Sequence, residues 1–261
     1  MSRHQAHAAQ RGFSLIELMV AMTLGLILVM GVAQLFLGSK RSFVLQQHMA
    51  VVQENARFVL TRVSRDLRQA GMFGCLDLDR LPAATRSQLP VDFAEPIAYA
   101  NGVLKVLSAV ASHDPIASAD YRSAADYDAR WLLASDCLSG LRIASGSDRL
   151  AVTPGEVLIP IRQIEYRQSR HDLQARINGV GNYETLIQGV TDFDVQFGLA
   201  GSADQRNAVG RYATTLTALD APLVRSVRIA LGLADNPADP GSALMPTQRF
   251  TLVTALRNRQ D

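Results

Sequence analysis

The sequence has few of the residue patterns that enzymes use for chemistry. It contains no Gly-x-Ser-x-Gly and no His-Glu-x-x-His motif, and the glycines of residues 140–146 lack the Lys-Ser/Thr ending of a phosphate-binding loop. Its five histidines are scattered, and neither of its two cysteines has a second ligand at zinc-finger spacing. We therefore expect no catalytic centre, cofactor or metal site.

An excess of charge of one sign is also nearly absent. The chain has 26 Lys and Arg against 24 Asp and Glu, which gives a formal net charge of +2. The two extra cations, Arg3 and Arg11, lie in residues 1–12, which contain no acidic residue, so the remainder of the chain is balanced. A basic footprint for nucleic acid is missing, and no direct nucleic-acid partner is expected.

No proline occurs before Pro82, so no proline interrupts a helix in the N-terminal part of the chain. Residues 18–37 form an apolar run without a charge, and as a helix they would extend roughly 30 Å, the thickness of a bilayer core. A secretory signal peptide cut after Ala33 is one alternative, but its apolar core is normally about 7 to 15 residues. The other alternative is a plain single-pass membrane anchor.

Residues 12–18 read Gly-Phe-Ser-Leu-Ile-Glu-Leu, directly after a short basic segment and before the apolar run. This pattern resembles the N-terminal signature of type IV pilins and of type II secretion pseudopilins. The resemblance implies that residues 1–12 are a leader, which a prepilin peptidase removes between Gly12 and Phe13, and that Phe13 is then N-methylated. It implies that residues 13–38 are the half of the helix that spans the membrane and later enters the filament core.

Glu17 has two possible roles. The resemblance implies that its carboxylate docks the subunit into the filament opposite the N-terminal amine of a neighbour, in apolar surroundings where such a pair interacts strongly. The simpler interpretation is an interfacial glutamate near a helix N-terminus, where the helix macrodipole favours negative charge. Local physical chemistry alone favours neither role.

The resemblance also implies a location. The N-terminus would be cytoplasmic, the helix would cross the bacterial inner membrane once, and the head would face the periplasm before the subunit joins a pilus at the cell surface. The positive-inside rule leaves the orientation open, because Arg3 and Arg11 before the span are matched by Lys40 and Arg41 after it.

Residues 39–71 are predicted to continue the helix as an amphipathic half that packs on the head. Apolar residues recur at helical spacing, among them Val52, Val59, Val63 and Leu67. Gly71 is a plausible C-terminal cap, and Asp66, four residues after Arg62, would add an ion pair on the surface. A free juxtamembrane coiled coil is the alternative, but the apolar positions do not keep a sustained heptad.

Residues 72–261 change to short apolar runs separated by turn residues, which predicts a globular head of antiparallel sheet. The predicted fold class is therefore α+β and type IV pilin-like, a long N-terminal helix packed by its second half on a β-rich head. We interpret residues 114–128 as a loop or short helix. The best strand candidates are residues 103–110, 130–135, 157–166, 192–198, 225–233 and 249–256.

The two cysteines, Cys75 and Cys137, would meet an oxidising compartment if the head faces the periplasm. We therefore expect a disulfide between them. Two buried free thiols and a metal site are the alternatives.

Several segments of the head resemble the PilW group of minor type IV pilins: residues 66–71, 74–75, 135–137, 189–193, 227–229 and 255–259. This resemblance implies a non-catalytic subunit of the complex that initiates the pilus and lies at its tip. Implied partners are other minor pilins, the major pilin and in many cases a PilY-type adhesin. The alternative within the same family is the J-type minor pseudopilin of type II secretion, which shares the leader and helix but usually lacks this cysteine pair. The alternative of a different class is a membrane-tethered periplasmic enzyme.

Overall fold

The computed structural model describes residues 12–78, 80–110, 116, 118–138, 140–202, 204–205, 208–217, 219–239 and 245–256. The chain forms two compact units, Met1–Ala50 and Val51–Asp261. The predicted leader, apart from Gly12, lies outside the described residues. So do residues 257–259, which carry part of the resemblance to PilW.

A single helix, α1 (Leu15–Gln69), contributes to both units. Its side chains in the first unit are exposed except for the half-buried Val44, whereas all of its buried residues belong to the second unit. The helix is followed by Gly71, whose φ of 73° lies in the left-handed region that favours glycine. The N–H of Gly71 donates to the carbonyl oxygen of Leu107 at 2.9 Å, so this glycine ties the chain after the helix to a strand of the head.

The larger sheet of the head has seven antiparallel strands in the order β1-β2-β7-β4-β5, with β8 pairing β7 and β9. Its centre is the long strand β7, whose first residues pair with β4 and whose last residues pair with β8. The strands are β1 (Ile97–Ala100), β2 (Val103–Ala109), β4 (Trp131–Ser135), β5 (Leu141–Ser145), β7 (Val157–Ser169), β8 (Asp172–Ile177) and β9 (Glu184–Gln188).

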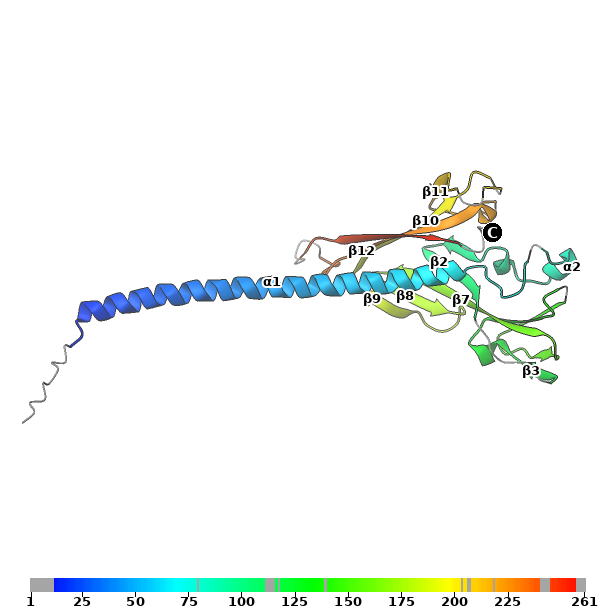
Figure 1. Cartoon of the computed structure of the whole chain (residues 1–261), viewed down its shortest axis with the longest axis horizontal. Helices are drawn as coiled ribbons and strands as arrows, with labels where there is room; N and C mark the ends of the chain where they lie inside the picture. Colours follow the sequence, from blue (N-terminus) through cyan, green and yellow to red (C-terminus); the bar gives the residue numbers. More distant parts are fainter. Residues whose placement is uncertain are drawn as a thin grey trace, which may run out of the picture. The chain divides into compact units, whose positions relative to one another are not determined.

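A second antiparallel sheet has the order β11-β10-β12-β13, and two short strands, β3 and β6, pair separately. These strands are β10 (Val190–Leu199), β11 (Arg211–Ala213), β12 (Val224–Leu233), β13 (Gln248–Ala255), β3 (Asp120–Arg122) and β6 (Leu150–Val152). The short helices are α2 (Ala83–Arg86), η1 (Val91–Phe93), η2 (Ala124–Tyr127) and η3 (Ala221–Leu223). Figure 1 labels α2, β3, β10, β11 and β12 among these elements of the head.

All six predicted strands are present, as β2, β4, β7, β10, β12 and β13. The interpretation of residues 114–128 was incomplete. The segment contains the short helix η2 but also strand β3, which pairs with β6. A strand of three exposed residues carries no alternating apolar pattern, so the sequence alone could not reveal it.

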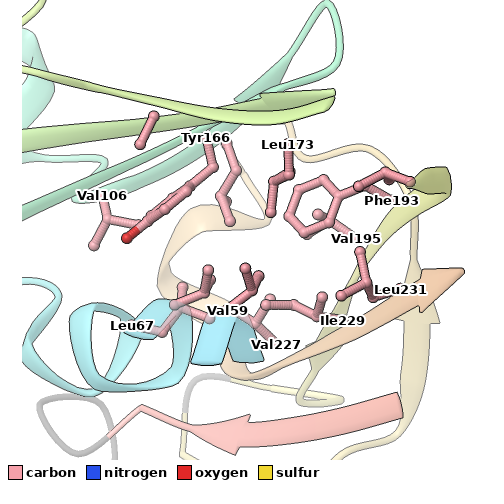
Figure 2. Close-up of a cluster of buried hydrophobic side chains, with 14 of the residues drawn as sticks. Val59, Leu67, Val106, Tyr166, Leu173, Phe193, Val195, Val227, Ile229 and Leu231 are labelled. Carbon is pink, nitrogen blue, oxygen red and sulfur yellow. The ribbon is translucent and has the colours of Figure 1, made fainter. Parts of the chain in front are cut away.

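The main core lies where the head part of α1 meets both sheets. Figure 2 shows Val59 and Leu67 of the helix facing Tyr166 and Leu173 of the larger sheet and Ile229 of the smaller one. These five side chains are fully buried. This long apolar helix followed by an antiparallel head confirms the predicted α+β architecture.

Candidate membrane and assembly segment

The predicted processing site lies just before α1. Residues 12–14 are not helical, and the carbonyl oxygen of Ser14 accepts the N–H groups of Glu17 and Leu18, both at 3.1 Å, as the first turn begins. The Phe13 side chain is 84% exposed. A Cβ atom added at Gly12 would have no neighbour within 4 Å, so packing within the chain does not require a glycine there. The Gly12–Phe13 peptide is therefore accessible, and a requirement for Gly12 would come from outside the described chain.

Glu17 lies in the first turn of α1, where the helix dipole favours a carboxylate. Its side chain is exposed, and within the described residues its carboxylate makes no ion pair or hydrogen bond. Both roles predicted for it, an interfacial residue and a docking group for another subunit, agree with this position.

The helix after Glu17 presents a continuous apolar surface. Every residue from 18 to 37 is exposed, and the run contains no charged residue. Of the helices in the described ranges, α1 alone is long and apolar enough to cross a membrane. Monomeric soluble proteins rarely expose apolar patches larger than a few hundred Å². This surface therefore needs a lipid or protein environment.

Comparison with known protein families matched residues 7–33 to the prokaryotic N-terminal methylation motif. The matched residues include the Gly12–Phe13 step, Glu17 and most of the apolar run. The motif supports a type IV pilin or pseudopilin family and a structural role. It implies general interaction with pilus components and with prepilin peptidase. No curated protein and no solved structure matched the chain.

Together, the motif, the apolar helix and the antiparallel head are consistent with a membrane-anchored protein that has a type IV pilin-like fold. The match covers only the N-terminal segment and does not extend into the head. Any finer assignment must therefore rest on the head itself.

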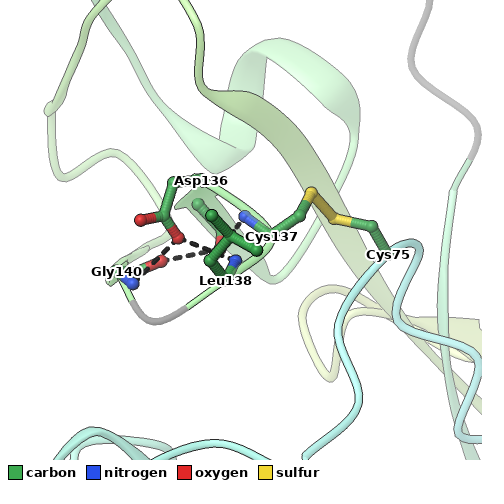
Figure 3. Close-up of a disulfide and its surroundings, with 6 residues drawn as sticks. Cys75, Asp136, Cys137, Leu138 and Gly140 are labelled. Atoms are coloured by element: carbon green, nitrogen blue, oxygen red, sulfur yellow. Dashed lines mark hydrogen bonds between the residues drawn. A yellow bond between two sulfur atoms is a disulfide. The ribbon is translucent and has the colours of Figure 1, made fainter.

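A disulfide in the head joins Cys75, shortly after α1, to Cys137, two residues after the end of β4 (Figure 3). Their Cα atoms are 5.6 Å apart, and 62 positions separate them in sequence. Cys137 has a left-handed φ of 61°, and its N–H donates to the Ser135 hydroxyl at 3.0 Å. The carboxylate of Asp136 accepts the N–H groups of Leu138 and Gly140, both at 2.9 Å. These bonds hold the tight turn that presents Cys137 to the segment after the helix.

The structure corrects the expected role of Asp66. The carboxylate is partly buried and accepts a hydrogen bond from the hydroxyl of Tyr166, a fully buried residue of β7. Burial raises the pKa of Asp66, although the Tyr166 hydrogen bond and the nearby Arg62 act in the opposite direction. Burial and the carboxylate of Asp66 raise the pKa of Tyr166. Asp66 therefore links the helix to the sheet and is not simply half of a surface ion pair.

A second buried carboxylate, Glu165 of β7, was not anticipated from the sequence. It accepts hydrogen bonds from Arg176 at 2.6 and 2.9 Å, from the Tyr183 hydroxyl at 2.7 Å and from the Gln163 amide at 2.6 Å. Burial opposes ionisation, but the hydrogen bonds from Tyr183 and Arg176 outweigh it and lower the pKa of Glu165.

Tyr183 in turn lies between two cations, with the guanidinium of Arg167 at 3.6 Å and that of Arg176 at 4.4 Å from its ring centre. All of these groups come from β7, β8 and the segment before β9. Because these polar groups are hydrogen-bonded or stacked on one another, the cluster stabilises the junction of these strands.

A shallow groove lies on the solvent-facing side of the smaller sheet, lined by Asp194, Gln196, Arg228, Ala230, Arg249 and Thr251. Arg249 forms ion pairs with Asp192 at 3.2 Å and Asp194 at 2.6 Å. Arg228 bonds to Gln196 at 3.3 Å and stacks on Tyr212. The charged groups thus satisfy one another. Among the described residues, no three potential metal ligands cluster together.

Proposed function

We propose that this protein is a minor type IV pilin of the PilW type, a structural subunit of the complex that initiates pilus assembly and lies at the pilus tip. The methylation motif over residues 7–33 and the exposed apolar helix that it overlaps support a pilin-like subunit. The observation that carries the finer assignment is the disulfide between Cys75 and Cys137 in the antiparallel head, because the J-type pseudopilin usually lacks this cysteine pair. Its partners are other minor pilins, the major pilin and a PilY-type adhesin.

Processing by prepilin peptidase removes residues 1–12 and leaves N-methylated Phe13 as the first residue. The exposed, non-helical Gly12–Phe13 step supports this, because a peptidase must reach an extended backbone. Intact-mass and N-terminal peptide analysis of the mature protein tests it. Retention of residues 1–12, or a mature chain that starts at Gln34, would contradict the proposal and favour a plain anchor or a signal peptide.

The mature protein spans the inner membrane through residues 13–38, with its N-terminus in the cytoplasm and its head in the periplasm. Residues 39–71 carry the helix into the head. The Cys75–Cys137 bridge supports a periplasmic head, because disulfides persist in that oxidising compartment and are rare in the cytoplasm.

The resemblance of the head to the PilW group has in one place a structural explanation. Gly189 has a φ of 87°, and a Cβ atom there would lie 2.7 Å from the carbonyl oxygen of Ala234. The carbonyl of Gly189 also accepts the N–H of Ala234 at 2.9 Å. A glycine here is required by the approach of two strands, so residues 189–193 support a shared head fold and do not by themselves identify a partner.

The J-type pseudopilin is the competing assignment, since it would share the motif and the helix. A deletion strain distinguishes the two when surface pili are counted by microscopy and secreted enzymes are assayed in the medium. A filament whose first subunits must associate before later contacts form depends on its initiator, much as a helix depends on its first turn. We therefore expect fewer pili, with unchanged secretion. Normal piliation with lost secretion would favour the pseudopilin.

A further inference from the structure

Strand β13 is an unusually open edge of the smaller sheet. Among the described residues it pairs with β12 alone, over eight consecutive residue pairs without a register shift. Its sequence contains no proline and no glycine, and its only charged residue is Arg249. Proteins normally protect such edges with short strands, bulges, prolines or several charges.

The other edge strands in the described ranges are protected in these ways. Strands β3, β6 and β11 have three residues each and β1 has four. Strand β5 has five residues and includes Arg142, and β9 has five and pairs with β8 through a register shift. Strand β10 pairs with β11 only at Phe197, Gly198 and Leu199, but the rest of that edge carries Asp192 and Asp194 and a register shift. Strand β13 is thus the one long edge among the described strands that has no register shift and a single charge.

The register identifies the backbone groups that face outward from this edge. The N–H of Leu256 donates to the carbonyl of Arg225 at 2.9 Å and continues the pairing of β13 with β12. Antiparallel strands alternate between hydrogen-bonded and non-hydrogen-bonded pairs. The even-numbered residues of β13 therefore bond to β12, whereas Arg249, Thr251 and Val253 direct their N–H and C=O groups away from it. Within the described residues, no backbone hydrogen bond satisfies these outward groups.

We propose that β13 is a docking edge for an extended segment of a different protein, which adds a fifth strand to this sheet. Main-chain hydrogen bonds to Arg249, Thr251 and Val253 supply the register, and alternate side chains supply the specificity. The half-buried side chains of Phe250 and Leu252 lie on the helix-facing side, and those of Thr251 and Val253 lie on the exposed side. The segment that fits has apolar residues at alternate positions.

The positive charge beside β13 indicates which kind of residue the partner segment carries. Buried Ser64 of α1 bonds to Thr254 of β13, so this flank of the helix adjoins the strand. Arg68, four residues after Ser64, shares that flank by helical spacing and is exposed. A strand added to β13 would bring its helix-facing side chains toward the guanidinium of Arg68. The partner segment therefore carries an acidic residue on its apolar side.

A second copy of this chain fits the β13 edge less well than a segment of a different protein. Strand β13 and the head part of α1 run in the same direction (Figures 1 and 2). An antiparallel pair of β13 strands would therefore set the two helices in opposite directions, which two chains anchored in one membrane cannot adopt. A parallel pair would place Phe250 and Leu252 beside the exposed face of the copy. The exclusion of the antiparallel pair rests on the proposed membrane anchoring.

The test uses the full-length protein in its own cells, with a photoreactive benzoyl-phenylalanine at position 253 on the exposed side of β13. The control probe replaces Val180, which is 72% exposed in the turn between β8 and β9. We expect a cross-link from position 253 to an alternating, acid-containing segment of another protein, identified by peptide mass spectrometry, and none to that segment from position 180. A cross-link to a copy of this chain, or no cross-link at position 253, would overturn the proposal.

The matched variants are Thr251→Pro, which removes an outward N–H without removing a bond to β12, and Thr251→Val, which keeps that N–H. We expect Thr251→Pro to lower the cross-link yield about tenfold and Thr251→Val to leave it unchanged. If Thr251→Pro unfolds the head, hydrogen exchange of the wild-type protein tests whether a partner strand binds β13. The amides of Thr251 and Val253 must become protected on assembly, and rapid exchange in the assembled state would overturn the proposal. Membrane fractionation of the same cells tests separately whether the protein is anchored in the membrane.

Discussion

The hydroxyl of Thr254 in β13 donates a hydrogen bond of 2.9 Å to the hydroxyl of Ser64 in α1, and both residues are buried. This contact joins the last strand of the head to its first helix across 190 positions of sequence. It fixes the open edge strand on the helix, so the position of that edge does not depend on its pairing with β12 alone.

We expect Ser64→Ala or Thr254→Val to destabilise the head by about 1 to 3 kcal/mol, because each leaves one buried hydroxyl without its partner. The double variant removes both hydroxyls, so its loss should be smaller than the sum of the two single losses. Denaturant unfolding of the full-length protein in detergent measures all three free energies of unfolding. Simple additivity would show that the bond contributes nothing to the coupling of helix and strand.

Asp66 should make the stability of the head fall as the pH rises. Its pKa is raised in the folded state, so between the ordinary value of 3.8 and the raised value the folded protein holds more protons than the unfolded chain. Asp66→Asn should remove this dependence. Unfolding midpoints of both proteins across the acidic range test the sign.

Glu165→Gln is a control, because the stability that Glu165 contributes changes with pH in the direction opposite to that of Asp66. The pKa of Glu165 is lowered in the folded state, so its stabilisation is present above its ordinary value of 4.5 and is lost as the pH falls through the lowered value. The extra stability of the wild-type head relative to Glu165→Gln should therefore be lost on acidification. Equal pH slopes for the Asp66 and Glu165 variants would contradict both assignments.

Loss of the disulfide should destabilise the head strongly. In the chain-entropy model, opening the loop between Cys75 and Cys137, which are 62 positions apart, costs about 4 kcal/mol. Cys75→Ser, Cys137→Ser and the double variant should therefore be destabilised to a similar extent, since each removes the same covalent link. Chemical unfolding under non-reducing conditions measures this. Alkylation of both thiols in the native, unreduced wild-type protein would show instead that the bridge is not formed.

Glu17→Ala should separate membrane insertion from assembly. Removing a carboxylate makes the span more apolar, so insertion should be unchanged. If Glu17 meets the N-terminal amine of a neighbouring subunit, entry into the filament complex should fall. Membrane fractionation and co-purification with other minor pilins measure the two steps.

Glu54→Ala is the matched control, because Glu54 is an exposed glutamate of the same helix that pairs with Arg57 in the head. It should leave both insertion and assembly unchanged. Normal co-purification and normal pilus numbers for Glu17→Ala would identify Glu17 as an interfacial residue only.

The amino-acid sequence by itself determined the long helix, the N-terminal motif and the six principal strands. Their signals are local: an uninterrupted apolar run, helical spacing of Val52, Val59 and Val63, and alternation along strands such as residues 192–198. The cysteine pair also suggested the bridge that the structure contains. Each of these inferences needs only neighbours in sequence or a simple pairing rule.

Only the tertiary structure decided which side chains meet. Nothing in the sequence indicated that Asp66 would bind Tyr166, one hundred positions away, or that Glu165 would bind Arg176 and Tyr183. Strand β13 reads as an ordinary alternating strand, and its open edge follows from the order β11-β10-β12-β13. Pairing partners and edges are set by contacts between distant segments, whose free energy depends on burial and hydrogen bonding that local periodicity does not encode.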